Sequence, residues 1–257
     1  MLSVKDITLT FGGVKALSNV TFDIQKDTVT GLIGPNGAGK TSLFNVVSGI
    51  YRPTSGKVLF KNDEISNLKL HQINRLGVAR TFQNVMVFPE LTLVENVMIG
   101  RQSRTKAGTI ASIFRTPSER KERKEAERRS IELLTYVGLE AKKDELAKNL
   151  PYGEQRQLDI ARALATDPEI LLLDEPAAGL NLQERVTLKA LIRKLNGIGY
   201  TIVLIEHDIK LVMGLCSQII VLEYGNKIAD GTPQSVQNDP RVIAAYLGTG
   251  GDEDAEH

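Results

Sequence analysis

"GPNGAGKT", residues 34–41, decides the fold, because it matches the pattern G-x-x-x-x-G-K-[ST]. A loop of this pattern holds nucleotide phosphates when it joins a strand to a helix. The preceding TVTGLI, residues 28–33, has the apolar character of a buried strand, and a helix is expected from about Lys40. This context favours a phosphate-binding loop over the alternative, a glycine-rich turn without a ligand.

The residue types within the loop predict its individual roles. Glycines let the backbone turn sharply, so that its N–H groups and the helix N-terminus hold the β-phosphate. Lys40 is expected to reach the β- and γ-phosphates, and the Thr41 hydroxyl to ligate Mg²⁺. The predicted nucleotide-binding residues of the loop are Gly34, Pro35, Asn36, Gly37, Ala38, Gly39, Lys40, Thr41 and Ser42.

A second apolar run ends in two carboxylates. "EILLLDEP", residues 169–176, predicts a buried strand with Asp174 and Glu175 at its C-terminal end. Ligands bind at that edge of a doubly wound sheet. We expect Asp174 to hold Mg²⁺ through water, and Glu175 to orient and deprotonate the water that attacks the γ-phosphate. The Asp–Glu pair alone is a weak signal, and the phosphate loop makes it a strong one.

The second half of the chain alternates between helices and short apolar strands. A helix expected at 155–166 leads to the strand that ends in Asp174 and Glu175, and a helix at 182–195 leads to a strand at 200–208. A hairpin turning at Gly225-Asn226 follows. This alternation predicts an α/β fold with a mostly parallel, doubly wound sheet.

Composition narrows the class of protein. The chain has 257 residues, a formal net charge of +1 and 42% hydrophobic residues, which is ordinary for a globular protein and argues against a nucleic-acid partner. The charged segment 118–134 mixes both signs, so a solvated helix face is favoured over a nucleic-acid patch. The single cysteine, Cys216, is expected to be a small buried side chain. We find no signal peptide, and no apolar run approaches the ~20 residues of a membrane helix.

Along the chain these motifs resemble those of the ATP-binding-cassette (ABC) ATPases, over nearly all of the sequence. The resemblance implies that Phe11 stacks on adenine, although a core aromatic at a strand end is the alternative. It implies that Gln83, in RTFQN, reaches Mg²⁺ and the attacking water, and that His207, in LIEHD, contacts the γ-phosphate. The expected catalytic residues are then Glu175, His207 and Gln83. The expected metal ligands are Thr41, Gln83 and Asp174.

The same resemblance implies a division of the chain. One ABC ATPase domain is expected over residues 1–250. A nucleotide-binding core with an antiparallel β subdomain would occupy about 1–85 and 160–250, and a helical subdomain about 86–160. Residues 251–257 are expected to be a disordered acidic tail.

"NLPYGEQRQL", residues 149–158, stands where the family carries LSGGQ, a loop that closes over the ATP of a partner subunit in a head-to-tail dimer. The residues expected to contact the partner's nucleotide are Pro151, Tyr152, Gly153 and Glu154. Pro151 replaces a serine, and Tyr152 replaces a glycine. In the following loop Ala178 replaces a serine and Asn181 an aspartate. We hypothesise that this subunit offers a weakened site to its partner.

Local features, including DEPAAGLN at 174–181 and GTPQSVQNDPRVIAAYLG at 231–248, resemble the ATPase subunits of branched-chain amino-acid importers. The resemblance implies a position on the cytoplasmic face of the membrane. It implies as partners two permease subunits, a second paralogous ATPase or a second copy, and indirectly an extracytoplasmic binding protein. Permease contact is expected just after Gln83, with Val87, Phe88 and Pro89 exposed; the alternative is that these residues form the core of the helical subdomain.

Three other functions stay open at this stage. The substrate could be urea, an amide or, for export, lipopolysaccharide. The chain could be a non-transport member of the superfamily. Chromosome-maintenance members would carry a very long coiled coil between Gln83 and the signature loop, which here begins already at Leu150. Translation-factor members would carry two cassettes in one chain, and this chain has one. A regulatory module without turnover is disfavoured by the presence of Glu175 and His207.

Overall fold

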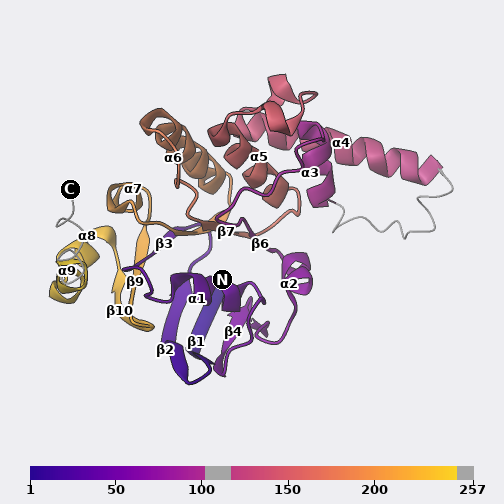
Figure 1. Ribbon diagram of the computed structural model, residues 1–257. Helices are drawn as coiled ribbons and strands as arrows, with labels where there is room; N and C mark the ends of the chain where they lie inside the picture. Colours follow the sequence, from indigo (N-terminus) through magenta and orange to yellow (C-terminus); the bar gives the residue numbers. More distant parts are fainter. Residues whose placement is uncertain (102–116, 248–257) are drawn as a thin grey trace.

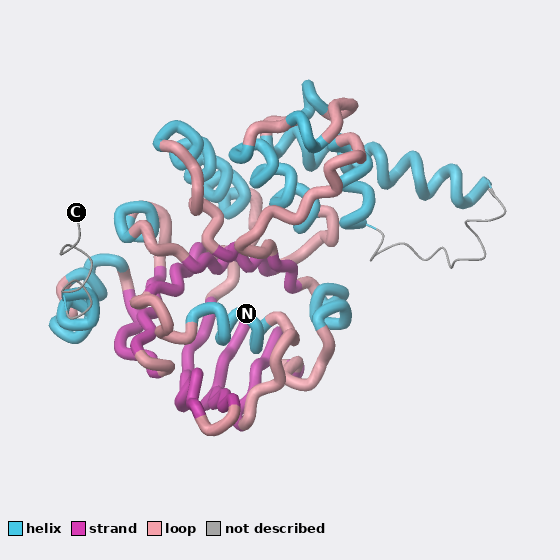
Figure 2. The backbone as a smooth tube through the Cα atoms, viewed as in Figure 1, coloured by secondary structure: helices cyan, strands magenta, loops and turns pink. Residues whose placement is uncertain are grey.

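The computed structural model describes residues 1–101 and 117–247 (Figure 1). The expected acidic tail at 251–257 lies outside these residues. The described chain forms two sheets, with helices above the central sheet, between the two sheets and beside them (Figure 2).

A six-stranded sheet lies at the centre, in the order β10-β9-β3-β8-β7-β6. Its first pair, β10 and β9, is antiparallel, and all other pairs are parallel, which confirms the expected sheet type. Every residue of β3, β7 and β8 is buried, as in a sheet covered on both faces. The strands are β3 (Val29–Ile33), β6 (Val78–Arg80), β7 (Ile170–Asp174), β8 (Thr201–Ile205), β9 (Gln218–Glu223) and β10 (Asn226–Gly231).

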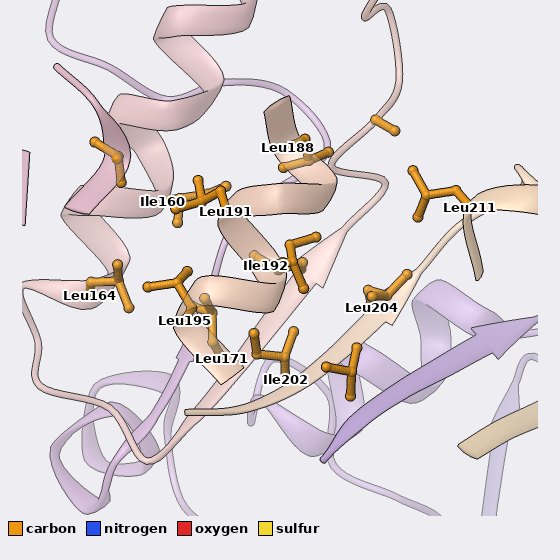
Figure 3. Close-up of a cluster of buried hydrophobic side chains, with 14 of the residues drawn as sticks. Ile160, Leu164, Leu171, Leu188, Leu191, Ile192, Leu195, Ile202, Leu204 and Leu211 are labelled. Atoms are coloured by element: carbon orange, nitrogen blue, oxygen red, sulfur yellow. The ribbon is translucent and has the colours of Figure 1, made fainter. Parts of the chain in front are cut away.

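Side chains alternate along each central strand and so divide between two cores. On one face, Leu171 and Ile202 pack with Leu195 of helix α6 (Leu182–Gly197), as Figure 3 shows. On the other face, Leu172 packs with Leu43 of helix α1 (Lys40–Val47) and with the second sheet. The loops at the strand ends are therefore held from both sides.

The second sheet is antiparallel, in the order β2-β1-β4-β5. Its strands are β1 (Leu2–Phe11), β2 (Val14–Ile24), β4 (Ser55–Phe60) and β5 (Asp63–Glu64). The turn between β4 and β5 lies at Lys61-Asn62, where φ is +52° and +74°. The last hairpin turns at Tyr224-Gly225 rather than at the expected Gly225-Asn226, because Asn226 already pairs with Glu223 in the ladder.

Three helices, α3 (Leu93–Arg101), α4 (Pro117–Val137) and α5 (Tyr152–Leu164), pack together through Leu93, Leu133 and Leu158. With the 3₁₀ turns η2 (Glu140–Lys142) and η3 (Ala147–Asn149) they form what we call the helical lobe. Helix α5 begins at residue 152, not 155 as expected, because Pro151 acts as its N-cap and accepts two backbone N–H bonds. The remaining helices are α2 (Leu70–Leu76), α7 (Ile209–Met213), α8 (Pro233–Gln237) and α9 (Pro240–Leu247).

Candidate functional site

The loop at 34–41 has the backbone conformation of a phosphate cradle. Gly34, Gly37 and Gly39 all have positive φ, at +152°, +77° and +99°, which only glycine adopts without strain. A Cβ at Gly34 would lie 2.1 Å from the Leu222 carbonyl oxygen, and one at Gly39 would lie 2.6 Å from that of Ala16. Around Gly37 there is open space instead. The loop is thus closed towards the protein and open on the side where phosphates can approach.

Lys40, the first residue of α1, lies across this loop. Its Nζ donates to the carbonyl oxygens of Gly34 at 2.6 Å and Pro35 at 2.8 Å. Burial lowers the pKa of Lys40, and the nearby negative charge of Glu175 opposes that effect. The two hydrogen bonds hold the ammonium group at the phosphate end of the site, where it interacts with the charge of Glu175, the residue expected to activate water.

Glu175, His207 and Gln83 meet at one edge of the central sheet. Gln83 Nε2 donates to Glu175 Oε2 at 2.9 Å, and His207 Nε2 lies 2.7 Å from Glu175 Oε1. Each residue follows the end of a parallel strand, β6, β7 or β8, and carboxyl ends of parallel strands share one edge. Glu175 itself has φ of +46°, an uncommon conformation for a non-glycine residue and one found at functional sites.

Asp174 is held by a buried partner that the sequence did not indicate. Arg80 Nη2 lies 2.7 Å from Asp174 Oδ2, and the two side chains are only 3% and 6% exposed. Arg80 also donates to Asn45 and Ser48 through Nη1. This network fixes one carboxylate oxygen of Asp174 on the protein side.

The oxygen donors present fit Mg²⁺. The Thr41 hydroxyl is exposed at the start of α1, and hydroxyl, carboxylate and amide oxygens are ligands that Mg²⁺ accepts. Across residues 1–101 and 117–247, no group of three His, Cys, Asp or Glu side chains is placed to hold a metal. Mg²⁺ is usually bound through one or two protein ligands together with waters and substrate phosphates.

Phe11 lies at the end of β1 with its ring exposed. It meets Tyr51 edge to face, with ring centroids 5.2 Å apart. An exposed ring steadied by a second ring is suited to stacking on a planar base, and its exposure disagrees with the alternative of a core aromatic.

The turn that stands in the place of LSGGQ is the first turn of α5. Tyr152 is exposed, whereas Gly153 is buried against Glu184, where a Cβ would lie 2.5 Å from Oε1. Glu154 forms an ion pair with Lys142 at 2.6 Å, within the helical lobe. The residues expected to serve a partner's nucleotide are thus also bonded within their own chain.

The loop 177–181 is fixed at both ends. The Ala177 N–H donates to Oε1 of the buried Glu206 at 2.7 Å, and burial raises the pKa of Glu206. Asn181 caps α6: its Oδ1 accepts from the Glu184 N–H at 3.0 Å, while Glu184 accepts from the Asn181 N–H. An aspartate forms the same cap, so the change to Asn181 is neutral for this helix. Asp208 caps α7 (Ile209–Met213), because its Oδ1 accepts from the Leu211 N–H at 3.0 Å.

Three side chains that position the site were not predicted: Arg80, Arg156 and Glu206. Arg156 and Glu206 are buried, the side chain of Arg80 is only 3% exposed, and each bonds to a residue far away in sequence or in a separate loop. For Arg80 and Glu206 the local signal was a charged residue beside an apolar stretch, whereas Arg156 stands among the polar residues Gln155 and Gln157. Cys216 is buried as expected, and burial raises its pKa to about 12.

A groove lies between the central sheet and the helical lobe, just after Gln83. It has a volume of about 330 Å³ and is lined by residues that include Arg80, Met86, Val87, Phe88, Asp159 and Arg162. Phe88 and Pro89 are exposed as expected, but Val87 is half-buried because it packs on the apolar core. Met86, which was not predicted, is more exposed than Phe88.

Comparisons with known proteins give the family of the chain. Residues 17–178 match the ABC transporter family, so the chain belongs to the ABC transporter ATP-binding proteins. Residues 226–252 also match the branched-chain amino acid ATP-binding cassette transporter family. The predicted family and fold class are confirmed.

Individual relatives are similar over almost the whole chain. The high-affinity branched-chain amino acid transport ATP-binding protein LivG of Escherichia coli is 45% identical, over 96% of this chain and 98% of its own length. The lipopolysaccharide export system ATP-binding protein LptB of Haemophilus influenzae is 32% identical, over 96% and 97%. The ADP conformation of MJ1267, an ATP-binding cassette of an ABC transporter, superposes with a TM-score of 0.84 at 31% identity, covering 96% and 98%.

Proposed function

We propose that this chain is the ATP-hydrolysing subunit of an importer of branched-chain amino acids. The observation that carries the proposal is the contact of Gln83 and His207 with the two oxygens of Glu175, beside a phosphate loop of the correct conformation. The 45% identity to LivG, against 32% to LptB, favours amino-acid import over lipopolysaccharide export.

The hydrolytic step follows from the positions of these side chains. The loop N–H groups and Lys40 bind the phosphates of ATP, and Glu175 accepts a proton from the attacking water. Gln83 and His207 hold Glu175 in place through hydrogen bonds, and both side chains lie beside the position expected for the γ-phosphate. Thr41, Asp174 and Gln83 would hold Mg²⁺, which would supply positive charge to neutralise the phosphate oxygens.

The first test separates binding from hydrolysis. Glu175→Gln keeps the shape of the side chain but cannot accept a proton, so kcat should fall by roughly 10² to 10⁴-fold while ATP affinity is kept. Radiolabelled ATP binding and phosphate release measure the two quantities. A variant that hydrolyses ATP at the normal rate would remove Glu175 from the mechanism.

We also propose that the subunit acts at the cytoplasmic face of the membrane with two permease subunits, and indirectly with an extracytoplasmic binding protein. No helix among the described residues is long and apolar enough to cross a bilayer. The groove after Gln83 is the proposed permease contact, because Met86 and Phe88 present apolar side chains at its rim. Leucine uptake into vesicles containing the assembled transporter tests this, with Phe88→Asp expected to abolish uptake while ATP binding is kept.

The pairing of two ATPase subunits is a further part of the proposal. Pro151 offers neither a hydroxyl nor an N–H to a partner's γ-phosphate, so we expect an unlike second ATPase rather than two equal sites. Replacing Pro151 and Tyr152 by Ser and Gly should raise hydrolysis at the partner-bound site. An unchanged rate there would contradict the idea of a weakened site.

A further inference from the structure

Arg156 is one of the largest fully buried side chains of the protein, with 1% of its surface exposed. A buried guanidinium is costly unless its N–H groups are bonded. Its Nη1 donates to the Phe82 carbonyl oxygen at 2.9 Å, and its Nη2 donates to that of Gln83 at 2.7 Å. Arg156 therefore joins helix α5 to the backbone of the residue whose side chain bonds Glu175.

Tyr152, one turn earlier on α5, completes the arrangement. Its hydroxyl accepts from Arg156 Nη2 at 3.1 Å, and its ring centroid lies 5.7 Å from the guanidinium carbon. The ring also lies over Gly179, where an added Cβ would be 3.1 Å from Tyr152 Cε1. One tyrosine thus contacts both the arginine that holds the Gln83 loop and the loop that follows Glu175.

The chain of contacts leads to the reacting end of the site. Arg156 fixes the carbonyls of residues 82 and 83, and the Gln83 side chain then reaches Glu175 Oε2 at 2.9 Å. Gln83 is exposed and belongs to an irregular segment without strand or helix bonds. Its orientation thus depends on the anchored backbone rather than on packing of its own side chain.

We propose that Tyr152 and Arg156 are positioning residues for hydrolysis in the subunit's own ATP site. They hold Gln83 against Glu175 and fix the loop at 177–181, so that the start of α5 and the water-activating carboxylate move as one unit. This inference rests on the proposed function, because it assigns Glu175 and Gln83 to hydrolysis. It gives Tyr152 a role in its own chain, separate from any contact with a partner's nucleotide.

Hydrogen exchange tests the mechanical part without any ATP turnover. Tyr152→Phe keeps the ring but removes the hydroxyl, which leaves one Arg156 N–H unpaired. Backbone amides at 82–84 and 177–180 should exchange about threefold to tenfold faster, the effect of one hydrogen bond. Tyr136→Phe is the matched control, since Tyr136 also bonds a residue one turn away, Glu132, at 3.3 Å on the same lobe. Equal exchange in both variants and the wild type would overturn the proposal.

Kinetics tests the positioning role. Tyr152→Phe should lower kcat about threefold to tenfold, and Arg156→Lys roughly tenfold or more, since three hydrogen bonds from a charged donor are changed. The KM for ATP should stay the same in both variants because the phosphate loop is untouched. A lowered thermal midpoint with kcat intact, or a raised KM with kcat intact, would indicate a purely structural arginine and contradict the proposal.

The last arm separates the subunit's own site from that of its partner. In the assembled transporter, the second ATPase carries a glutamine in place of its catalytic glutamate, so that only ATP bound by this chain is hydrolysed. Tyr152→Phe should still lower kcat. A loss seen only when the second subunit's ATP is the one hydrolysed would overturn the proposal. If the wild-type transporter hydrolyses no ATP, the proposed function fails, and hydrogen exchange alone decides whether the coupling exists.

Discussion

The phosphate loop and the start of helix α5 both lie at helix N-termini, yet they are built differently. The phosphate loop is fixed by backbone: Gly34 and Gly39 lie against the carbonyl oxygens of Leu222 and Ala16, which belong to strands and cannot move without their sheets. The α5 turn is fixed by side chains, with Gly153 against Glu184 and Tyr152 against Arg156. Side chains yield more easily than backbone. The first region should tolerate almost no change, and the second should be adjustable.

The largest expected effect comes from a matched pair of glycine substitutions. Gly34→Ala places a Cβ 2.1 Å from a backbone oxygen at a φ of +152°, so the loop must rearrange. Backbone strain of ~3 kcal/mol corresponds to a loss of about 100-fold in ATP affinity. Gly153→Ala meets only the side chain of Glu184 and no backbone, so it should leave ATP affinity unchanged. Calorimetric titration with ATP measures both, and equal losses would mean that the two regions do not differ in rigidity.

A second comparison concerns buried and exposed ion pairs. Arg80→Ala leaves the Asp174 carboxylate buried without its partner and should lower the free energy of unfolding by about 3–5 kcal/mol. Arg185→Ala removes the ion pair with Asp208, whose side chains are 41% and 27% exposed, and should cost less than about 1 kcal/mol. Urea denaturation gives both values. Similar costs would show that Arg80 does not stabilise the site through Asp174.

Helix α5 also contains a titratable group that should make stability depend on pH. Burial raises the pKa of Asp159 from 3.8 to about 6, against the opposing charges of Arg162 and Arg156. Below about pH 4 the carboxyl is protonated in both the folded and the unfolded state, so its burial as a charge does not lower the free energy of unfolding. As the pH rises towards 6 the unfolded chain ionises more readily, and the free energy of unfolding falls by about 2–3 kcal/mol.

Asp159→Asn removes this dependence, because the amide does not titrate. The difference between wild type and variant should grow between about pH 4 and pH 6 and stay constant above. Chemical denaturation at a series of pH values measures it, and the difference isolates Asp159 from the other titrating groups. A difference that is constant over this range would mean that Asp159 keeps an ordinary pKa in the folded protein.

The sequence predicted the phosphate loop and the Asp–Glu strand well because their signals are local. A strand, a glycine pattern and a helix within a short stretch leave few alternative conformations. Arg80 and Arg156 could not be predicted, because their partners Asp174 and Gln83 lie 94 and 73 residues away and only the folded sheet brings them together. The start of α5 was misplaced by three residues because Pro151 can act as an N-cap without any side-chain bond. A helix end that is set by backbone geometry alone is difficult to predict from the sequence.

The smallest expected effect is that of Pro151→Ser, which alters the adjustable region at its cap. A serine at this position can accept from an N–H of the first turn, which stabilises a helix by about 1 kcal/mol. Loss of proline makes the unfolded chain more flexible and costs about 0.4–1 kcal/mol. The two contributions nearly cancel, so the free energy of unfolding should change by less than about 0.5 kcal/mol. Any change in hydrolysis at the partner-bound site would then come from the added hydroxyl and N–H rather than from a change in stability. A large shift in the denaturation midpoint would instead show that Pro151 holds α5 in place by more than its cap geometry.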